Sequence, residues 1–422
     1  MALSDYRQDM ETCCRCSACK FIPFENVKGY DNVNVCPSIA RHNFHAYSGG
    51  GKLALGVALL EKEINFSDKL LEVIYNCQMC GACDVSCKYA MDMDVLEPLE
   101  AIRRECVENG HTLPVLNKLI ERLHKTGSGA PVNGRKTAWF DNLQIKDAAR
   151  QNSAVLFHAG CRTAGNPRLW KIAQSAVKLL QNAGIEVGIA GYAESCCGSR
   201  AFQMGYQSDF LKMAEIKMQY LKDCGATTLV TACAECYYAF KVLYDRFKLK
   251  GGLEVLHTSQ YLGRLVQEGK IVPRKAVKMN VTYHDPCHLG RKGEPYIHWA
   301  GKQIPGHIRL FDPPREFRRG TLGVYDPPRV LLNSIPGLKL TEMARIKEYA
   351  WCCGGGGGVL ESNTKFATWT ASERVREAAA SGASVLVTAC PGCNSLLEGT
   401  VKSEGIDLQP MDLVEVLAES VL

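Results

Sequence analysis

The chain has 422 residues, of which 46% are hydrophobic and 22% are charged, and its formal net charge is +6. That length predicts two or three domains, and the composition is typical of a globular protein. The sequence has no apolar run near the roughly 18 residues of a membrane span, no signal peptide and no basic block that would indicate nucleic acid, so we expect a cytoplasmic protein.

Cysteine is the unusual component, with 21 residues. In a reducing compartment, clustered cysteines are more typical of metal or redox sites than of structural disulfides. The odd number also excludes complete pairing.

Two runs with cysteine at every third residue lie in the first 110 residues, CCRCSACK and NCQMCGACDVSCK. In two-cluster ferredoxins the fourth cysteine of each run serves the other cluster. The two predicted cubane [4Fe-4S] ligand sets are Cys13, Cys16, Cys19 with Cys87, and Cys77, Cys80, Cys83 with Cys36. Zinc ribbons are the alternative, but two triple runs plus two single cysteines suit cubanes better. The stretch LALGVALLEKE reads as helix, which predicts a helical ferredoxin-like domain over residues 1–110.

After an expected linker at residues 111–150, the order C, CCG, CxxC occurs twice. The first copy reads VLFHAGC, ESCCGSR and LVTACAEC, and the second VTYHDPC, WCCGGGG and LVTACPGC. We expect one domain over residues 151–275 and its repeat over 276–422.

Short apolar strands alternate with helices in both copies. SAVLFHAG, IEVGIAG, ATTLVTAC, MNVTYHD and ASVLVTAC read as strands, with helical segments such as SDFLKMAEIKMQYLKDCG and TKFATWTASERVREAAASG between them. The alternation predicts parallel α/β sheets, which carry ligands at the carboxyl ends of their strands. Five cysteines of each copy are thus expected at one sheet edge.

Five cysteines exceed the four that a cubane or a zinc ion needs. Buried free thiols would not recur with the same spacing, and a CxxC dithiol would leave three cysteines unexplained. A metal–sulfur cluster of unusual nuclearity accounts for all five. Glycines beside the cysteine pairs (Gly198, Gly354 and Gly355) would let backbone N–H groups reach the sulfurs.

This repeat resembles the cysteine-rich CCG domain of the heterodisulfide reductase family, and the whole layout is similar to the HdrD type of subunit. The resemblance implies a noncubane [4Fe-4S] cluster in each copy, at which a disulfide of the coenzyme M–coenzyme B type is reduced. The implied ligands are Cys161, Cys196, Cys197, Cys233 and Cys236 in the first copy, and Cys287, Cys352, Cys353, Cys390 and Cys393 in the second. Cys14, Cys106 and Cys224 remain unassigned and are expected to be free thiols.

The second copy also carries an insertion at residues 294–323, rich in Pro, Gly, aromatic and basic residues. It is predicted to be a long ordered loop, which either has a function or only decorates the surface. It resembles an insertion in HdrD-like proteins of anaerobic bacteria, including that of the class II benzoyl-CoA reductase complex.

His158, His284 and His288 stand beside the first cysteine of each copy, where they could deliver a proton or orient a turn. Tyr237 and Tyr238 are expected in the core or as a cover over the site. We expect substrate or a partner to approach the copy with five glycines.

The chain lacks a Gly-rich dinucleotide fingerprint after a strand, so its electrons are expected from a partner. The resemblance implies an HdrA-like flavoprotein or a membrane cytochrome subunit, which would also make any link to the inner membrane. Two functions follow: the catalytic subunit of a disulfide reductase, or a non-catalytic electron-transfer subunit, as in benzoyl-CoA reductase or glycolate oxidase complexes.

Overall fold

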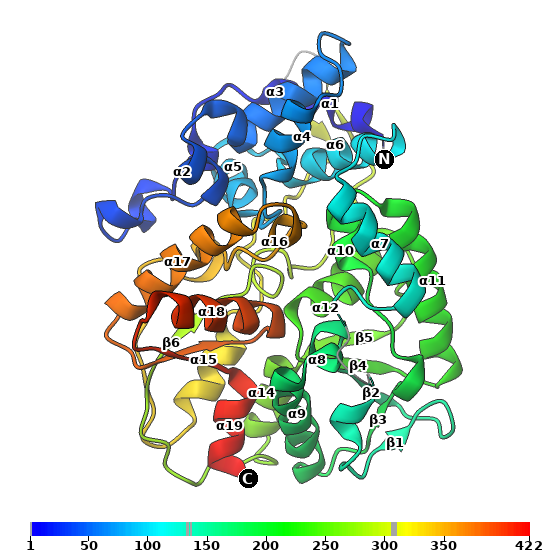
Figure 1. Cartoon of the computed structure of the whole chain (residues 1–422), viewed down its shortest axis with the longest axis vertical. Coiled ribbons are helices and arrows are strands. Elements are labelled where there is room, and N and C mark those ends of the chain that lie inside the picture. The colour runs from blue at the N-terminus through cyan, green and yellow to red at the C-terminus, as the bar shows by residue number, and fades with distance from the viewer. Residues whose placement is uncertain (1, 132–134, 136, 305–309) are drawn as a thin grey trace.

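The computed structural model describes residues 2–131, 135, 137–304 and 310–422. Helices build its first part, which lies as a blue and cyan layer above the rest (Figure 1). They are α1 (Arg7–Thr12), α2 (Pro37–His42), α3 (Gly49–Leu60), α4 (Asp68–Tyr75), α5 (Ala82–Met91), α6 (Leu96–Glu108) and α7 (Pro114–Thr126). Ser48 and Ser67 cap α3 and α4 by accepting backbone N–H groups, as serine does at helix starts. The predicted helical ferredoxin-like domain is confirmed.

A five-stranded parallel sheet follows, in the order β1-β3-β2-β4-β5. Its strands are β1 (Lys146–Asp147), β2 (Val155–His158), β3 (Val187–Ile189), β4 (Thr228–Thr231) and β5 (Glu254–His257). The helices around it are α8 (Cys161–Gly165), α9 (Trp170–Asn182), α10 (Ser199–Gln203), α11 (Gln207–Asp223), α12 (Ala234–Tyr238), α13 (Tyr244–Arg246) and α14 (Thr258–Gln267). Helices cover such sheets on both faces, which is why these strands are nearly continuous apolar runs.

The second sheet has four parallel strands in the order β11-β10-β6-β9. The strands are β6 (Asn280–His284), β9 (Lys339–Leu340), β10 (Val385–Thr388) and β11 (Gln409–Asp412). The helices are α15 (Asp326–Asn333), α16 (Val359–Ser362), α17 (Thr364–Ala380), α18 (Pro391–Glu404) and α19 (Leu413–Val421). The last helix, α19, packs on α9 of the first repeat (Figure 1), so the two repeats share a helical seam. The predicted pair of α/β repeats is confirmed.

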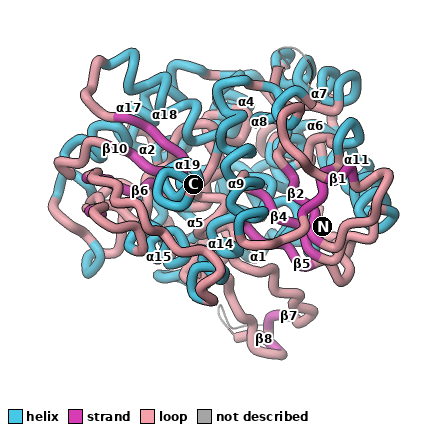
Figure 2. Tube along the Cα trace, turned by 90° about the horizontal axis from the view of Figure 1, so that it is seen from below, coloured by secondary structure: helices cyan, strands magenta, loops and turns pink. Residues whose placement is uncertain are grey.

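Two segments that were expected to be a linker and a loop contain regular secondary structure. The stretch at 111–150, expected as a linker, contains α7 and also β1, which pairs with β3 of the first sheet. The insertion forms a small antiparallel hairpin of β7 (Lys302–Gln303) and β8 (Phe311–Asp312) that projects from the body (Figure 2). Its residues 305–309 lie outside the described part.

Hydrogen bonds and ion pairs hold the rest of the insertion against the body of the protein. The carboxylate of Glu294 accepts N–H groups from Gly320 (2.7 Å) and Leu322 (3.1 Å), which closes the base of the loop. Arg315 then reaches Asp9 at 3.3 Å and also pairs with Asp94 of the N-terminal domain. These contacts tie the second repeat to the ferredoxin-like domain.

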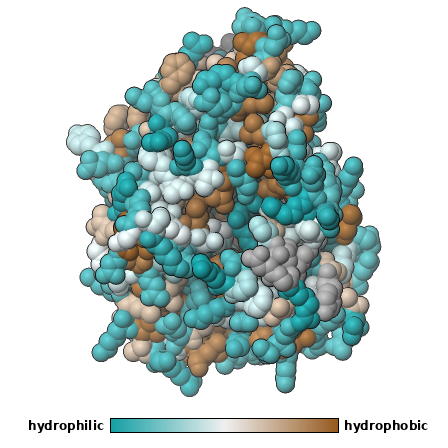
Figure 3. Space-filling model, in the orientation of Figure 1, coloured by the Kyte–Doolittle hydropathy of each residue, from teal (hydrophilic) through white to brown (hydrophobic). Residues whose placement is uncertain are grey.

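The surface is mostly hydrophilic on the face drawn in Figure 3, with hydrophobic residues scattered between polar ones. Among the described residues, no helix combines the length and apolar character that crossing a bilayer requires.

Candidate functional site

The carboxyl ends of the strands bring the cysteines of each repeat together. In the first sheet β2 and β4 are neighbours with His158 opposite Thr231, so Cys161 and Cys233 emerge at the same edge. The second sheet repeats this with β6 and β10, where His284 lies opposite Thr388. Each CxxC pair begins a helix, α12 or α18, so its second cysteine turns back toward the edge.

The five cysteines of the first repeat form a continuous row of sulfur contacts. The Sγ atoms of Cys161 and Cys196 are 3.7 Å apart. Cys196 and Cys197 shift each other's pKa, and Cys236 also shifts the pKa of Cys197. Cys233 and Cys236 are neighbours in the same way. The five cysteines therefore lie next to one another at this edge of the sheet.

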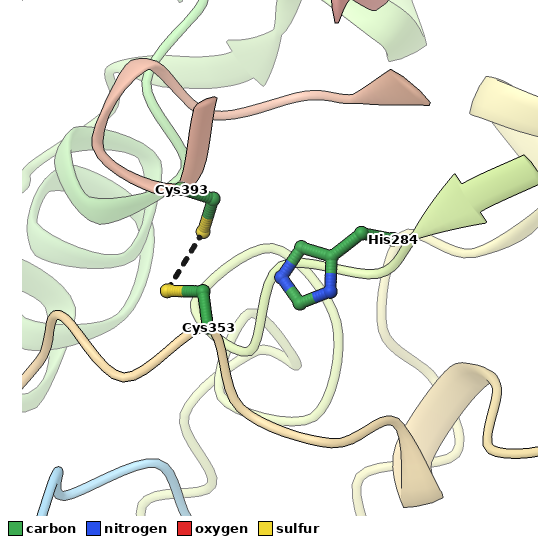
Figure 4. A group of neighbouring side chains, drawn as sticks. All are labelled: His284, Cys353 and Cys393. Atoms are coloured by element: carbon green, nitrogen blue, oxygen red, sulfur yellow. Dashed lines mark hydrogen bonds between the residues drawn. The ribbon is translucent and has the colours of Figure 1, made fainter. Parts of the chain in front are cut away.

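The second repeat has an equivalent row. The Sγ atoms of Cys353 and Cys393 are 3.3 Å apart. Cys287 and Cys353 lie close enough to Cys352 to raise its pKa, and Cys393 is likewise a neighbour of Cys390. Figure 4 shows Cys353 and Cys393 approaching each other beside His284.

The two rows touch each other and the N-terminal domain. Cys233 of the first repeat and Cys390 of the second lie close enough that each shifts the pKa of the other. At the other end, Cys352 packs in one buried cluster with Cys80 of the second N-terminal run. Neighbouring cysteines thus lead from the ferredoxin-like domain through the second repeat to the first.

The N-terminal cysteines of each run lie close to other cysteines of the domain. Cys13, Cys16, Cys19 and Cys87 line one small cavity, with Gly50 among its walls and its N–H donated to Cys19 Sγ at 3.5 Å. Burial and the neighbouring sulfurs of Cys36, Cys77 and Cys80 hold the pKa of Cys83 well above its usual range. Cys14 also reaches the first cavity, but its side chain is exposed and its sulfur contacts Met91 Sδ at 4.0 Å.

This donor set fits iron–sulfur clusters. Burial raises the pKa of the Cys36 thiol to about 12, and most of the other grouped thiols are buried as well. Thiols packed this closely cannot all ionise unless a cation neutralises them, and a coordinated metal deprotonates a thiol outright. Soft thiolates in such numbers select iron–sulfur clusters, zinc or copper(I).

The glycine after each cysteine pair has the same task in both repeats. Gly354 donates its backbone N–H to Cys352 Sγ at 3.3 Å, and the backbone N–H of Gly198 acts on Cys196 in the direction that lowers its pKa. Both residues are in the left-handed region, with φ of +79° and +98°. A Cβ on Gly354 would also lie 2.3 Å from the Ala367 carbonyl oxygen. Gly355 lies beside Cys353, where a Cβ would be 4.0 Å from its sulfur.

The remaining glycines of the run serve a different contact. A Cβ on Gly356 or Gly357 would lie 2.5 Å from the carbonyl oxygen of Gln78 or Cys77 respectively. Within this chain, the segment that approaches the glycine-rich copy is therefore the second N-terminal cysteine loop.

Arg103 of α6 is the residue that sequence reasoning missed. It is fully buried, and its guanidinium donates to the carbonyls of Gln203 (2.8 Å) and Gly357 (2.7 Å). It also donates to Ile74 (3.0 Å) and Cys77 (2.7 Å). One side chain thereby joins the ferredoxin-like domain to both repeats. In the sequence, Arg103 next to Arg104 looks like part of a solvated helix face.

The three histidines near the cysteines are all buried. His288 Nδ1 lies 3.6 Å from Cys287 Sγ, and its Nε2 lies 3.1 Å from Gln203 Oε1 and 3.3 Å from Lys292 Nζ. His158 is the last residue of β2 and His284 the last residue of β6. Tyr237 and Tyr238 are buried, with the Lys292 ammonium 4.4 Å above the Tyr238 ring.

Two of the unassigned cysteines, Cys106 and Cys224, are also buried, and no row includes them. Cys106 lies on α6 and Cys224 directly after α11.

Comparisons with known proteins match this architecture. The family model "Cysteine-rich domain" matches residues 155–241 and 311–398, and "4Fe-4S dicluster domain" matches residues 9–91. The chain is 30% identical over 426 residues to the HdrD subunit of dihydromethanophenazine:CoB–CoM heterodisulfide reductase from Methanosarcina acetivorans, covering 98% of this chain and 94% of that protein.

Two further similarities are more distant. EtfAB:quinone oxidoreductase of Syntrophomonas wolfei is 25% identical over 97% of this chain, which spans 58% of that protein. A hypothetical protein from Helicobacter pylori has a similar fold, with a TM-score of 0.53 and 12% identity over 88% of this chain and 67% of its own.

Proposed function

Since the chain belongs to the HdrD family of heterodisulfide reductase subunits, an oxidoreductase family, we propose that it is the iron–sulfur subunit that reduces a disulfide with electrons from a partner. The partner would be an HdrA-like flavoprotein or a membrane cytochrome subunit in a hetero-oligomeric complex. The disulfide would be of the coenzyme M–coenzyme B type.

The observation that carries this proposal is the succession of neighbouring cysteines from Cys80 through Cys352 and the second repeat to Cys390 and Cys233. Electrons that enter at the N-terminal domain would find the second repeat first and the first repeat last. Both five-cysteine sets are complete, which supports two loaded sites rather than one.

The ligands are assigned from the groups described above. When bound, two cubane and two noncubane [4Fe-4S] clusters would store and pass single electrons between donor and disulfide. The N-terminal ligands would be Cys13, Cys16, Cys19 and Cys87, and Cys77, Cys80, Cys83 and Cys36; the others would be Cys161, Cys196, Cys197, Cys233 and Cys236, and Cys287, Cys352, Cys353, Cys390 and Cys393.

The approach of the disulfide is set by burial. Among the ten cysteines of the repeats, Cys161 and Cys287 are half-buried and the other eight are buried. Arg162 lies next to Cys161 and keeps part of its side chain accessible, with Glu235 at 3.8 Å. It would attract the anionic groups of such a substrate. Reduction consumes two electrons from the donor and two protons from water, breaks the S–S bond and yields two thiols.

The test is turnover by the iron-loaded protein. Reduced viologen would serve as donor and the coenzyme M–coenzyme B disulfide as acceptor, with thiol release and viologen oxidation both measured. We expect two viologens oxidised per disulfide, loss of turnover in Cys161→Ala and full turnover in the matched variant Cys14→Ala. If the fully loaded protein released no thiol, either alone or with its electron-donating partner, disulfide reduction would be excluded.

A second candidate function is electron transfer without disulfide chemistry, which is favoured by the similarity to EtfAB:quinone oxidoreductase along 97% of the chain. In that case reduced EtfAB would reduce the loaded protein, and Cys161→Ala would leave this reduction unchanged.

A further inference from the structure

The two repeats share a buried histidine and a buried cation behind their cysteines. His158 and His284 each stand three residues before the first cysteine, Cys161 or Cys287. Lys217 and Arg374 each stand 16 residues before the first cysteine of the CxxC pair (217 to 233 and 374 to 390). All four side chains are at most 2% exposed, so the repeat has preserved an internal pair and not a surface feature.

In the second repeat, the cation determines where the histidine carries its proton. The Arg374 Nε–H donates to His284 Nδ1 at 3.0 Å. A guanidinium nitrogen has no acceptor capacity, so Nδ1 must be unprotonated. The proton of the neutral imidazole is therefore on Nε2.

Arg374 is itself held in place. Its NH1 donates to Glu377 Oε2 and to the Arg345 carbonyl oxygen, both at 2.9 Å. Arg345 binds the same Glu377 carboxylate at 2.9 Å, so two guanidinium groups share one carboxylate and the group keeps a net positive charge. These hydrogen bonds fix the orientation of the Arg374 guanidinium, which in turn fixes the ring.

The other ring nitrogen faces the cysteines. His284 Nε2 has no hydrogen-bond partner among the described residues. A ring nitrogen of His284 lies within 4.8 Å of the sulfurs of Cys353 and Cys393, and Figure 4 shows it turned toward them. A buried N–H without an oxygen or nitrogen acceptor costs free energy, and the sulfurs of a loaded site would remove that cost.

The first repeat has the opposite arrangement. His158 Nδ1 faces a carboxylate and not a guanidinium, with Glu194 Oε1 at 3.6 Å, and this negative charge favours a proton on Nδ1. The Lys217 ammonium has no hydrogen-bond partner in the part of the chain that the structure describes. The Nε2 of His158 is then the lone-pair nitrogen, and it gives the first site no N–H.

We propose that Arg374 is a positioning residue that holds the His284 proton on Nε2, so that this imidazole donates a hydrogen bond to the sulfurs of the second site while the first site lacks the equivalent donor. Hydrogen bonds to cluster sulfurs favour the reduced, more negative state and raise the reduction potential. The second repeat, which receives electrons first, is thereby made easier to reduce than it would otherwise be. The inference rests on the proposed ligand set and not on the disulfide substrate.

The experiment is an EPR-monitored redox titration of the iron-loaded protein, with iron content measured for every variant. His284→Met should lower the midpoint potential of one cluster signal, and His284→Gln, which returns an N–H donor, should largely restore it. The matched change in the first repeat, His158→Met, should not lower any potential. An unchanged potential in a fully loaded His284→Met protein would overturn the proposal.

A double variant distinguishes two ways in which Arg374 could act, by holding the His284 ring or through its own charge. Arg374→Gln should lower the same potential in the native background and add no further shift to His284→Met. An equal shift in both backgrounds would mean that the guanidinium acts directly, which contradicts a positioning role.

If either variant fails to incorporate its iron–sulfur clusters, a measurement on the protein with its native sequence tests the proposal. Pulsed EPR on protein with ¹⁵N-labelled histidine should detect one imidazole coupling and one deuterium-exchangeable proton at the second-site signal. Their absence would also overturn the inference. A failure of disulfide turnover would leave these spectra unaffected, so the two proposals fail separately.

Discussion

Cys80 and Cys352 pack in the same buried cluster, close enough that each shifts the pKa of the other, although 271 residues separate them in the chain (81 to 351). Cys80 belongs to the second N-terminal run, and Cys352 is the first cysteine of WCCGGGGG. Because electron transfer falls steeply with distance, electrons would pass from the ferredoxin-like domain into the repeats at this contact under the proposed function.

The first prediction concerns that entry point. Cys80→Ser should remove the iron of the second N-terminal site and slow reduction of the second repeat roughly tenfold or more. Iron analysis and rapid-freeze EPR after mixing with an N-terminal electron donor measure both effects. Cys224→Ser is the matched control, since Cys224 is also buried but touches no site. An equal loss of iron in the control would mean that buried thiols support the fold and not the clusters.

The second prediction separates two adjacent cysteines. Cys16→Ser should lose the iron of the first N-terminal site, because Cys16 lines its cavity and stands in the three-residue step with Cys13 and Cys19. Cys14→Ser should keep all iron, because Cys14 is out of that step, although it also lines the cavity. Iron and sulfide content of the two purified variants measures the difference. Iron loss in Cys14→Ser would mean that Cys14 is a cluster ligand, which contradicts the proposed set.

The third prediction concerns the glycine run. Gly357 has φ of +61°, and a Cβ there would lie 2.5 Å from the Cys77 carbonyl oxygen. Gly357→Ala should destabilise the protein by about 1 kcal/mol from backbone strain and by about 1–3 kcal/mol more from overpacking.

Gly405 provides the control for this variant. It has a similar φ of +63° with nothing within 4 Å of its Cβ position, so Gly405→Ala should show the strain alone. Anaerobic denaturant unfolding of both variants measures the difference. Equal losses would mean that the cysteine loop and the glycine run are not in contact.

The fourth prediction concerns the buried arginine that joins three domains. Arg103→Met removes four hydrogen bonds and leaves buried carbonyl groups unpaired, so it should cost about 3 kcal/mol or more. Thermal unfolding of the loaded protein measures this loss. Arg150→Met is the control, because the Arg150 side chain is 84% exposed and should contribute almost nothing. A loss below that of the control would contradict the role of Arg103 as the joining residue.

The sequence alone determined the number and kind of the repeats. Cysteine spacing within one loop is a local property, and glycine after each cysteine pair is required wherever the backbone turns to donate an N–H to sulfur. The apolar strands β2, β4, β6 and β10 were predictable for the same reason, since burial on both faces selects continuous apolar runs.

Tertiary structure alone decided how the parts meet. Which sheet edge faces the N-terminal loop depends on packing between segments hundreds of residues apart, and no local pattern encodes it. The contacts Cys80–Cys352 and Cys233–Cys390, the burial of Arg103, and the opposite partners of His158 and His284 all arise in this way. The sequence predicted glycines that approach sulfur, and Gly354 does so; only the fold showed that Gly356 and Gly357 instead make room for the chain's own cysteine loop.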